Sequence, residues 1–224
     1  MNSFVDTIER RIQQIDAPFL LPLSPPSSLS VGEETPEEII MLAHRALEEV
    51  HDIIAGVIMD TAAFLRFGSF GIAAFEAIFD IAQDFEIPIL ADVFSGASLS
   101  TSQSVLETFS FQGSFPCIAI RMACMGEEIS RYIRSQSNSV VFLPEYPNAP
   151  YIYSSSADLL IRERNPKAFL LIDGNQPTMH FRNEAGGGVL HINRTVEPLL
   201  WKERSKPSLR NRFIDTSKDF LSLR

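Results

Sequence analysis

The sequence predicts an α/β fold in which short apolar strands alternate with amphipathic helices, and three observations point to it. Apolar runs of strand length are separated by stretches whose apolar residues recur at helical spacing. The 224 residues, 45% of them hydrophobic, can bury one sizeable core, so we expect a single domain. The apolar run from Ile87 to Ala91 delivers Asp92 at its carboxyl end, and in a parallel α/β barrel such residues line the catalytic mouth.

An amphipathic helix opens the chain, because Phe4, Ile8, Ile12 and Ile15 fall at helical spacing. We expect it to cover the closed end of the barrel. Pro18 to Leu23 is the first expected strand. A second helix is expected to begin at Thr35, where a capping residue, a proline and a glutamate form a capping box. The stripe that this helix buries is expected to comprise Ile40, Ala43, Leu47, Val50 and Ile54.

The later elements follow the same alternation. The second strand is expected over Ala55 to Met59 and the third over Ile87 to Ala91. Between them, a helix over Gly71 to Phe85 carries an apolar face made of Ile72, Phe75, Ile78, Phe79, Ala82 and Phe85. Further strands are expected at Pro116–Met122, Val140–Leu143, Ala168–Ile172 and Gly188–Ile192.

No residue pattern indicates a metal site. His44 and His51 share a helical face, but two full turns separate them, which is too far for one ion, so we interpret both as surface residues. Cys117 and Cys124 lie in or beside one apolar segment and are interpreted as core residues of a protein from a reducing compartment.

The charge of the chain excludes some partners. The net charge of −9 argues against broad affinity for nucleic acid, which requires a basic surface. Only the tail, Lys202 to Arg224, is locally basic, and we interpret it as a solvated terminal helix or else as a partner-binding arm. No apolar run approaches the length of a membrane span, and Met1 to Gln14 is already amphipathic and charged. We therefore expect a soluble cytoplasmic protein.

Two neighbouring stretches resemble a known family. Ala62 to Glu76 reads A-A-F-L-R-F-G-S-F-G-I-A-A-F-E, and Ile87 to Thr101 reads I-P-I-L-A-D-V-F-S-G-A-S-L-S-T. These are similar to the orotidine 5'-monophosphate decarboxylase family, which reads A-F-F-E-R-F-G-S-x-G-I-A-A-L-E and then has a strand ending in D-x-K-x-x-D-I-x-x-T. The resemblance implies one TIM (β/α)8-type barrel over residues 1–224. Too few residues separate Asn148 from Gln176 for two complete units, so we expect one β/α unit to be shortened or missing.

The catalytic part of the motif departs from the family. Asp92 stands at the first Asp and Thr101 at the Thr, but Phe94 replaces the Lys and Ala97 replaces the second Asp. Asp92 also has a structural interpretation, in which it caps the next helix or accepts hydrogen bonds from loop amides. The resemblance further places Ser24 at a family Asp that contacts the sugar of the substrate, and Ile58 at a family Lys.

The phosphate-binding part of the family pattern is better matched. Asp173 to Gln176, D-G-N-Q, resembles the family loop P-G-x-G-A-Q, so the resemblance makes Gly174 and Gln176 candidate phosphate ligands. Arg194 lands at the family's phosphate-binding Arg. Gln176 and Arg194 each have a structural alternative: Gln176 could close a loop, and Arg194 could form a surface ion pair.

Three functions remain open. The first is a pseudoenzyme that binds a phosphorylated small molecule, such as a pyrimidine nucleotide. The second is an active lyase of altered chemistry that uses Asp92. The third is a purely structural dimeric scaffold. The family's reaction needs no cofactor, so the resemblance implies none. It also implies a homodimer, because in the family the loop that carries Thr101 reaches into the partner's site.

Overall fold

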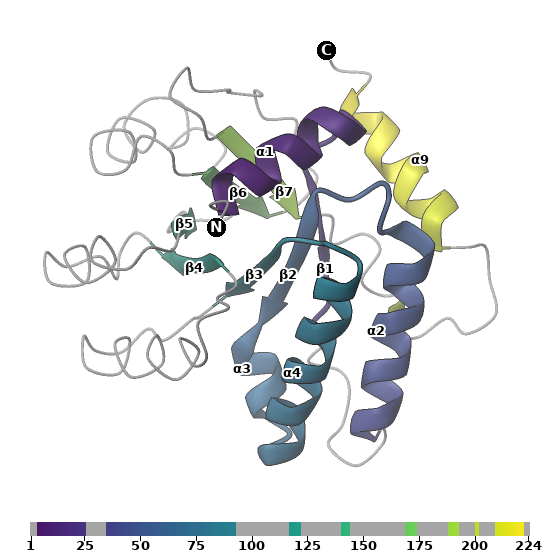
Figure 1. Ribbon diagram of the computed structural model, residues 1–224, viewed down its shortest axis with the longest axis vertical. Coiled ribbons are helices and arrows are strands. Elements are labelled where there is room, and N and C mark those ends of the chain that lie inside the picture. The colour runs from purple at the N-terminus through teal and green to yellow at the C-terminus, as the bar shows by residue number, and fades with distance from the viewer. Residues whose placement is uncertain are drawn as a thin grey trace, which may run out of the picture.

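The computed structural model of the chain describes residues 4–25, 35–92, 117–121, 140–143, 169–173, 188–192, 200–201 and 209–221. Its described strands pair in parallel with their neighbours in the chain, and β7 pairs with β1, so that the ring closes (Figure 1). The strands are β1 (Phe19–Pro22), β2 (Gly56–Asp60), β3 (Ile89–Asp92), β4 (Cys117–Arg121), β5 (Val140–Leu143), β6 (Phe169–Asp173) and β7 (Gly188–Ile192). This agrees with the expected α/β barrel, and every expected strand lies within two residues of its predicted bounds.

The number of β/α units stays a prediction. Among the described strands β5 pairs directly with β6, through Phe142 and Leu170. The segment between them, residues 144–168, lies outside the described residues. The expectation of one shortened or missing unit falls on this segment.

Helix α1 (Phe4–Ile15) crosses the end of the barrel at which the strands begin (Figure 1). The Ile8 side chain is fully buried there, and a Cβ placed on Gly56, the first residue of β2, would lie 3.1 Å from its Cδ1 atom and 2.8 Å from the Pro88 carbonyl oxygen. The Arg11 guanidinium donates to the Ile54 carbonyl at 3.0 Å. The expected cover of the closed end is confirmed, and Gly56 is required for the close approach.

Helix α2 (Pro36–Val50) begins with the predicted capping box. The Thr35 hydroxyl accepts from the Glu38 amide at 3.3 Å, and the Glu38 carboxylate accepts from the Thr35 amide at 2.9 Å. The predicted stripe is correct except at its first position, where Ile39 is buried and Ile40 only half-buried.

The short helix α3 (Thr61–Leu65) and the longer α4 (Ser69–Asp84) follow β2. Their corner explains one error of the sequence analysis. Ile72 was expected in the apolar face, but it is 41% exposed. The helix begins before Gly71, and Gly71 is the residue that faces α3: a Cβ there would lie 1.8 Å from the Phe64 carbonyl oxygen. Close backbone approach therefore turns Ile72 outward.

Helix α9 (Leu209–Leu221) lies in the tail that was interpreted as a solvated helix, and one face of it is buried. Leu209 and Phe213 are buried, and the Phe213 ring meets the Phe19 ring of β1 edge-on, with centroids 6.2 Å apart. The helix contacts α2 and so packs on the barrel (Figure 1). Residues 202–208 and 222–224 of the tail lie outside the described residues.

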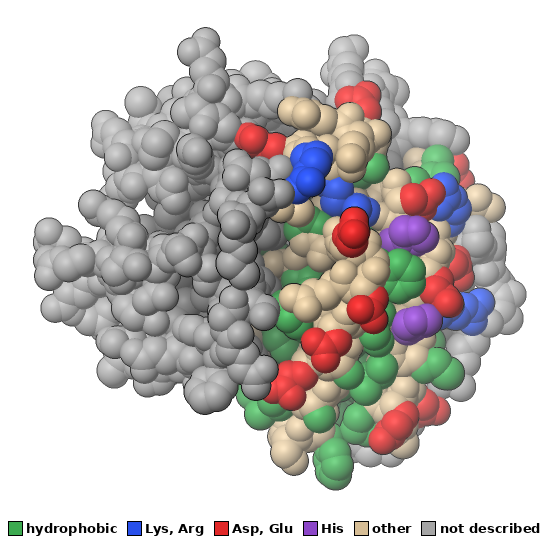
Figure 2. Space-filling model, viewed as in Figure 1, with side chains coloured by type: hydrophobic (Ala, Val, Ile, Leu, Met, Phe, Trp, Pro, Cys, Tyr) green, Lys and Arg blue, Asp and Glu red, His purple; other side chains and the backbone are tan. Residues whose placement is uncertain are grey.

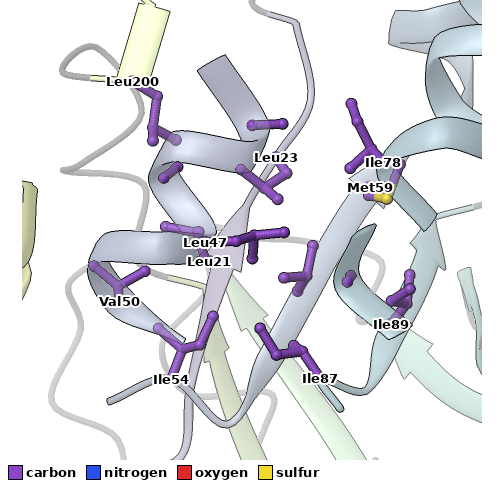
Figure 3. Close-up of a cluster of buried hydrophobic side chains, with 14 of the residues drawn as sticks. Leu21, Leu23, Leu47, Val50, Ile54, Met59, Ile78, Ile87, Ile89 and Leu200 are labelled. Atoms are coloured by element: carbon purple, nitrogen blue, oxygen red, sulfur yellow. The ribbon is translucent and has the colours of Figure 1, made fainter. Parts of the chain in front are cut away.

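The described core lies between the strands β1 to β3 and the helices that cover them. Side chains from β1, β2 and α2 point toward one another in it, among them Leu21, Met59 and Leu47 (Figure 3). Leu200, which follows β7 in the chain, joins the same cluster. None of the described helices is both long and apolar enough to cross a membrane.

Candidate functional site

Two carboxylate side chains stand at the ends of neighbouring strands, at the same level of the barrel. Asp60 is the last residue of β2, Asp92 is the last residue of β3, and the two are register partners. Neighbouring strands lie about 4.8 Å apart, and the carboxyl ends of parallel strands share one rim of a barrel, so both residues stand at that rim. Each is half-buried. The predicted position of Asp92 at a strand end is confirmed.

Asp60 also caps the helix that follows it. Its Oδ1 atom accepts hydrogen bonds from the amides of Ala62 at 2.9 Å and Ala63 at 3.4 Å. These bonds satisfy two of the donors that a helix N-terminus leaves without partners. The capping role considered for Asp92 in the sequence is thus seen at Asp60, and it holds the Asp60 side chain in one orientation.

Ser24 lies just beyond β1 and is buried, with 8% of its surface exposed. Its hydroxyl accepts a hydrogen bond from the Asp60 amide at 2.6 Å. The neighbouring Leu23 amide donates to the Ile58 carbonyl at 2.9 Å. Ser24 therefore joins the end of β1 to the end of β2 within the protein.

Thr61 makes the matching link on the other side of β2. It is 2% exposed, and its hydroxyl donates to the Asp92 carbonyl oxygen at 3.0 Å. Ile58 is 4% exposed and brings no charge to this edge. The Arg66 guanidinium, in the same segment of the chain, donates to the Ala63 carbonyl at 3.3 Å and lies 5.4 Å from the centre of the Phe67 ring.

Most of the predicted site residues fall outside the described residues. These are Phe94, Ala97, Thr101, Gly174, Gln176 and Arg194. The strand ends that precede the predicted phosphate ligands are described: Asp173 ends β6 and Ile192 ends β7, and they are register partners. Gly174 and Arg194 follow these two ends closely in the sequence.

No group of three or more His, Cys, Asp or Glu within the described part of the chain is placed to hold a metal ion. His44 and His51 lie on the outer face of the barrel instead, with the Phe85 ring 5.9 Å from the first imidazole and 5.0 Å from the second. Figure 2 shows histidine side chains among acidic ones on this face. His44 is exposed and His51 half-buried, as expected of surface positions.

No protein-family model matches the chain, and no curated protein sequence matches it. Solved structures do match. The chain has the fold of solved OMP decarboxylases. Against the Leishmania donovani OMP decarboxylase the TM-score is 0.71 at 15% identity, covering 99% of this chain and 98% of that chain. The Plasmodium berghei orotidine 5'-monophosphate decarboxylase gives 0.65 at 12% identity, covering 97% and 99%.

A longer solved protein matches too. The Leishmania donovani UMP synthase gives a TM-score of 0.71 at 14% identity, and the match covers 100% of this chain but 57% of that one. The chain therefore corresponds in extent to a whole decarboxylase and to part of the synthase. At identities this low, the structural matches establish a shared fold and nothing more. That fold agrees with the barrel that the sequence resemblance implied.

Asp60 was missed by the sequence analysis although a signal was present. It directly follows the apolar run Ala55 to Met59, just as Asp92 follows its own run. The criterion that singled out Asp92 applies equally to Asp60.

Proposed function

We propose that this protein is a divergent, non-catalytic member of the orotidine 5'-monophosphate decarboxylase family that binds a phosphorylated small molecule, such as a pyrimidine nucleotide. The observation that carries the proposal is the fold likeness, which extends over nearly the whole of this chain and of each solved decarboxylase. The position of Asp92 at the carboxyl end of β3 supports it, because the family motif begins with an Asp at a strand end.

Loss of catalysis follows from the charges that are missing. In the family a Lys donates the proton to the developing carbanion, and Phe94 cannot do so. Ile58 is apolar and buried, and Lys167 is the first lysine of the whole sequence. Lys167 comes before β6 in the sequence, whereas the family Lys follows the end of a strand. Loss of a positioned acid costs about two to four orders of magnitude in rate.

The phosphate end is supported by the residue types that follow β6 and β7. Arg194 can bind phosphate oxygens through two parallel hydrogen bonds, and Gln176 can donate to them. Gly174 allows backbone amides to approach the anion. Barrel enzymes commonly bind phosphate at the last strand ends.

Thermal denaturation of the full chain with uridine monophosphate, inorganic phosphate and orotidine monophosphate tests the proposal. A ligand that binds only the folded state raises its stability by about 2.7 kcal/mol at one hundred times its dissociation constant. We expect uridine monophosphate to raise the melting temperature and no carbon dioxide to be released from orotidine monophosphate. Unchanged melting with all three ligands would contradict ligand binding and favour the purely structural scaffold.

The register of Asp60 and Asp92 favours a second candidate function, a lyase of altered chemistry. Two carboxylates at one rim are groups able to act as general acid and general base. Product analysis with phosphorylated substrates separates this candidate from the first. Turnover by the wild type that Asp92→Asn abolishes, with Asp84→Asn as a control on the far end of α4, would establish it.

The proposal includes a homodimer, which the resemblance implies through Thr101. Light scattering of the full chain should give twice the mass of one chain. A monomer that nonetheless binds uridine monophosphate would remove the dimer from the proposal and keep its ligand.

A further inference from the structure

Two buried hydroxyl groups link the carboxyl end of β2 to both of its neighbours. On one side the Ser24 hydroxyl accepts from the Asp60 amide at 2.6 Å. On the other side the Thr61 hydroxyl donates to the Asp92 carbonyl at 3.0 Å. Both side chains are more than nine-tenths buried. Three consecutive strands of the ring are thus joined by side chains at the rim where the two carboxylates stand.

These bonds stand where the backbone ladder ends. Asp60 and Asp92 are the last residues of their strands, and β1 ends before Ser24. Backbone groups beyond a ladder still need partners when they are shielded from water. A hydroxyl can accept from an amide or donate to a carbonyl, so Ser24 and Thr61 supply the two different partners that β2 and β3 require here.

The consequence is that both acidic residues are held by their backbones. The Asp60 amide is held by Ser24, and the Asp60 carboxylate is aimed by the Ala62 and Ala63 amides. The Asp92 carbonyl is held by Thr61. Binding groups have to be placed to within about 0.5 Å to be effective, and buried supporting hydrogen bonds provide such placement.

We propose that Ser24 and Thr61 are positioning residues for Asp60 and Asp92, and that these two carboxylates contact the part of the ligand distant from its phosphate. The inference rests on the proposed function, because it assigns a supporting pair to the same site. Ser24 and Thr61 themselves are buried and act through the two acidic residues.

The test compares Thr61→Val, which removes the hydroxyl at nearly constant shape, with Thr61→Ser, which keeps it. Titration of the full chain with uridine monophosphate should give roughly five- to tenfold weaker binding for Thr61→Val, as expected for one lost hydrogen bond. Thr61→Ser should bind like the wild type. Inorganic phosphate should bind all three proteins equally, since it lacks the part of the ligand that Asp60 and Asp92 would contact.

Thr216→Val is the matched control. The Thr216 hydroxyl also donates to backbone carbonyls, of Arg212 at 2.9 Å and Phe213 at 3.1 Å, but within helix α9. An effect on stability alone would leave the affinity for uridine monophosphate unchanged in both Thr61→Val and Thr216→Val. Equal affinity of Thr61→Val and the wild type for uridine monophosphate would overturn the inference.

A measurement without ligand separates this inference from the proposed function. The side-chain carboxyl carbon resonances of Asp60 and Asp92 can be followed by NMR at one pH. The Asp92 resonance should shift in Thr61→Val and return to its wild-type position in Thr61→Ser. Exchange of the Asp60 amide with solvent should accelerate in Ser24→Ala, which also serves if Thr61→Val does not fold. If the wild type binds neither uridine monophosphate nor inorganic phosphate, the proposed function fails, but the NMR and exchange measurements still test the positioning roles of Ser24 and Thr61. If the Asp92 resonance and the Asp60 amide exchange do not change in these variants, the positioning roles are wrong.

Discussion

Arg210 of helix α9 binds Asp52, in the connection between α2 and β2, through both terminal nitrogens of its guanidinium group. One of these hydrogen bonds measures 2.8 Å, and the Arg210 side chain also donates to the Glu49 carbonyl at 3.2 Å. On the same connection, Arg11 of α1 donates to the Ile54 and His51 carbonyls. Helices from both ends of the chain therefore hold the segment that leads into β2.

The Arg210 contact predicts a dependence of stability on pH. The hydrogen bond from Arg210 lowers the pKa of Asp52 in the folded protein. The stabilisation of the folded protein by this ion pair is therefore fully present above about pH 4, the pKa of Asp52 in the unfolded chain. It is lost as the pH falls through the lower pKa that Asp52 has in the folded protein. The pair is half-exposed, so we expect Asp52→Asn to cost at most about 1 kcal/mol near neutral pH. Urea denaturation near pH 7 and near pH 2 should show this difference shrinking in acid, and Asp84→Asn should show no such trend.

Docking of α9 should depend on the Phe213 side chain. Phe213 is 1% exposed, and replacing a buried Phe by Ala costs about 3–5 kcal/mol. Phe70→Ala is a matched control, because Phe70 is 68% exposed and its removal should change stability little. Urea denaturation of the two variants checks the contrast. Equal stabilities would mean that α9 contributes nothing to the fold.

The corner between α3 and α4 should tolerate no side chain at Gly71. An added Cβ would lie 1.8 Å from the Phe64 carbonyl oxygen, and a backbone atom cannot rotate away as a flexible side chain can. We expect Gly71→Ala to destabilise the protein by about 1–3 kcal/mol, as overpacking does. Ala73→Ser, an equally small change at an exposed position of the same helix, should lie within about 0.5 kcal/mol of the wild type in the same urea denaturation.

Phosphate affinity should depend on Arg194. Removing a charge-assisted hydrogen bond costs about 1.5–3 kcal/mol, so Arg194→Ala should bind inorganic phosphate and uridine monophosphate at least tenfold more weakly. Arg212→Ala removes an exposed arginine of α9 and should bind both ligands normally. Calorimetric titration measures both variants. Normal binding by Arg194→Ala would mean that Arg194 does not bind the phosphate group of the ligand.

Local patterns in the sequence predicted the elements well. Helical spacing located α1, the capping box located the start of α2, and apolar runs located the strands, because each pattern records which face of a single element is buried. The same patterns failed at Ile72. Its exposure depends on how closely α4 approaches α3, and the periodicity of one helix carries no information about that distance.

The sequence by itself determined that strands and helices alternate, that Asp92 ends a buried strand and that lysine is missing before Lys167. Only the tertiary structure decided that Asp60 is the register partner of Asp92 and that Ser24 and Thr61 join their strands. It also decided that one face of the terminal helix packs on β1 through Phe213. The physical reason is that strand register and helix docking are set by contacts between residues distant in the chain, whereas secondary structure follows from neighbours.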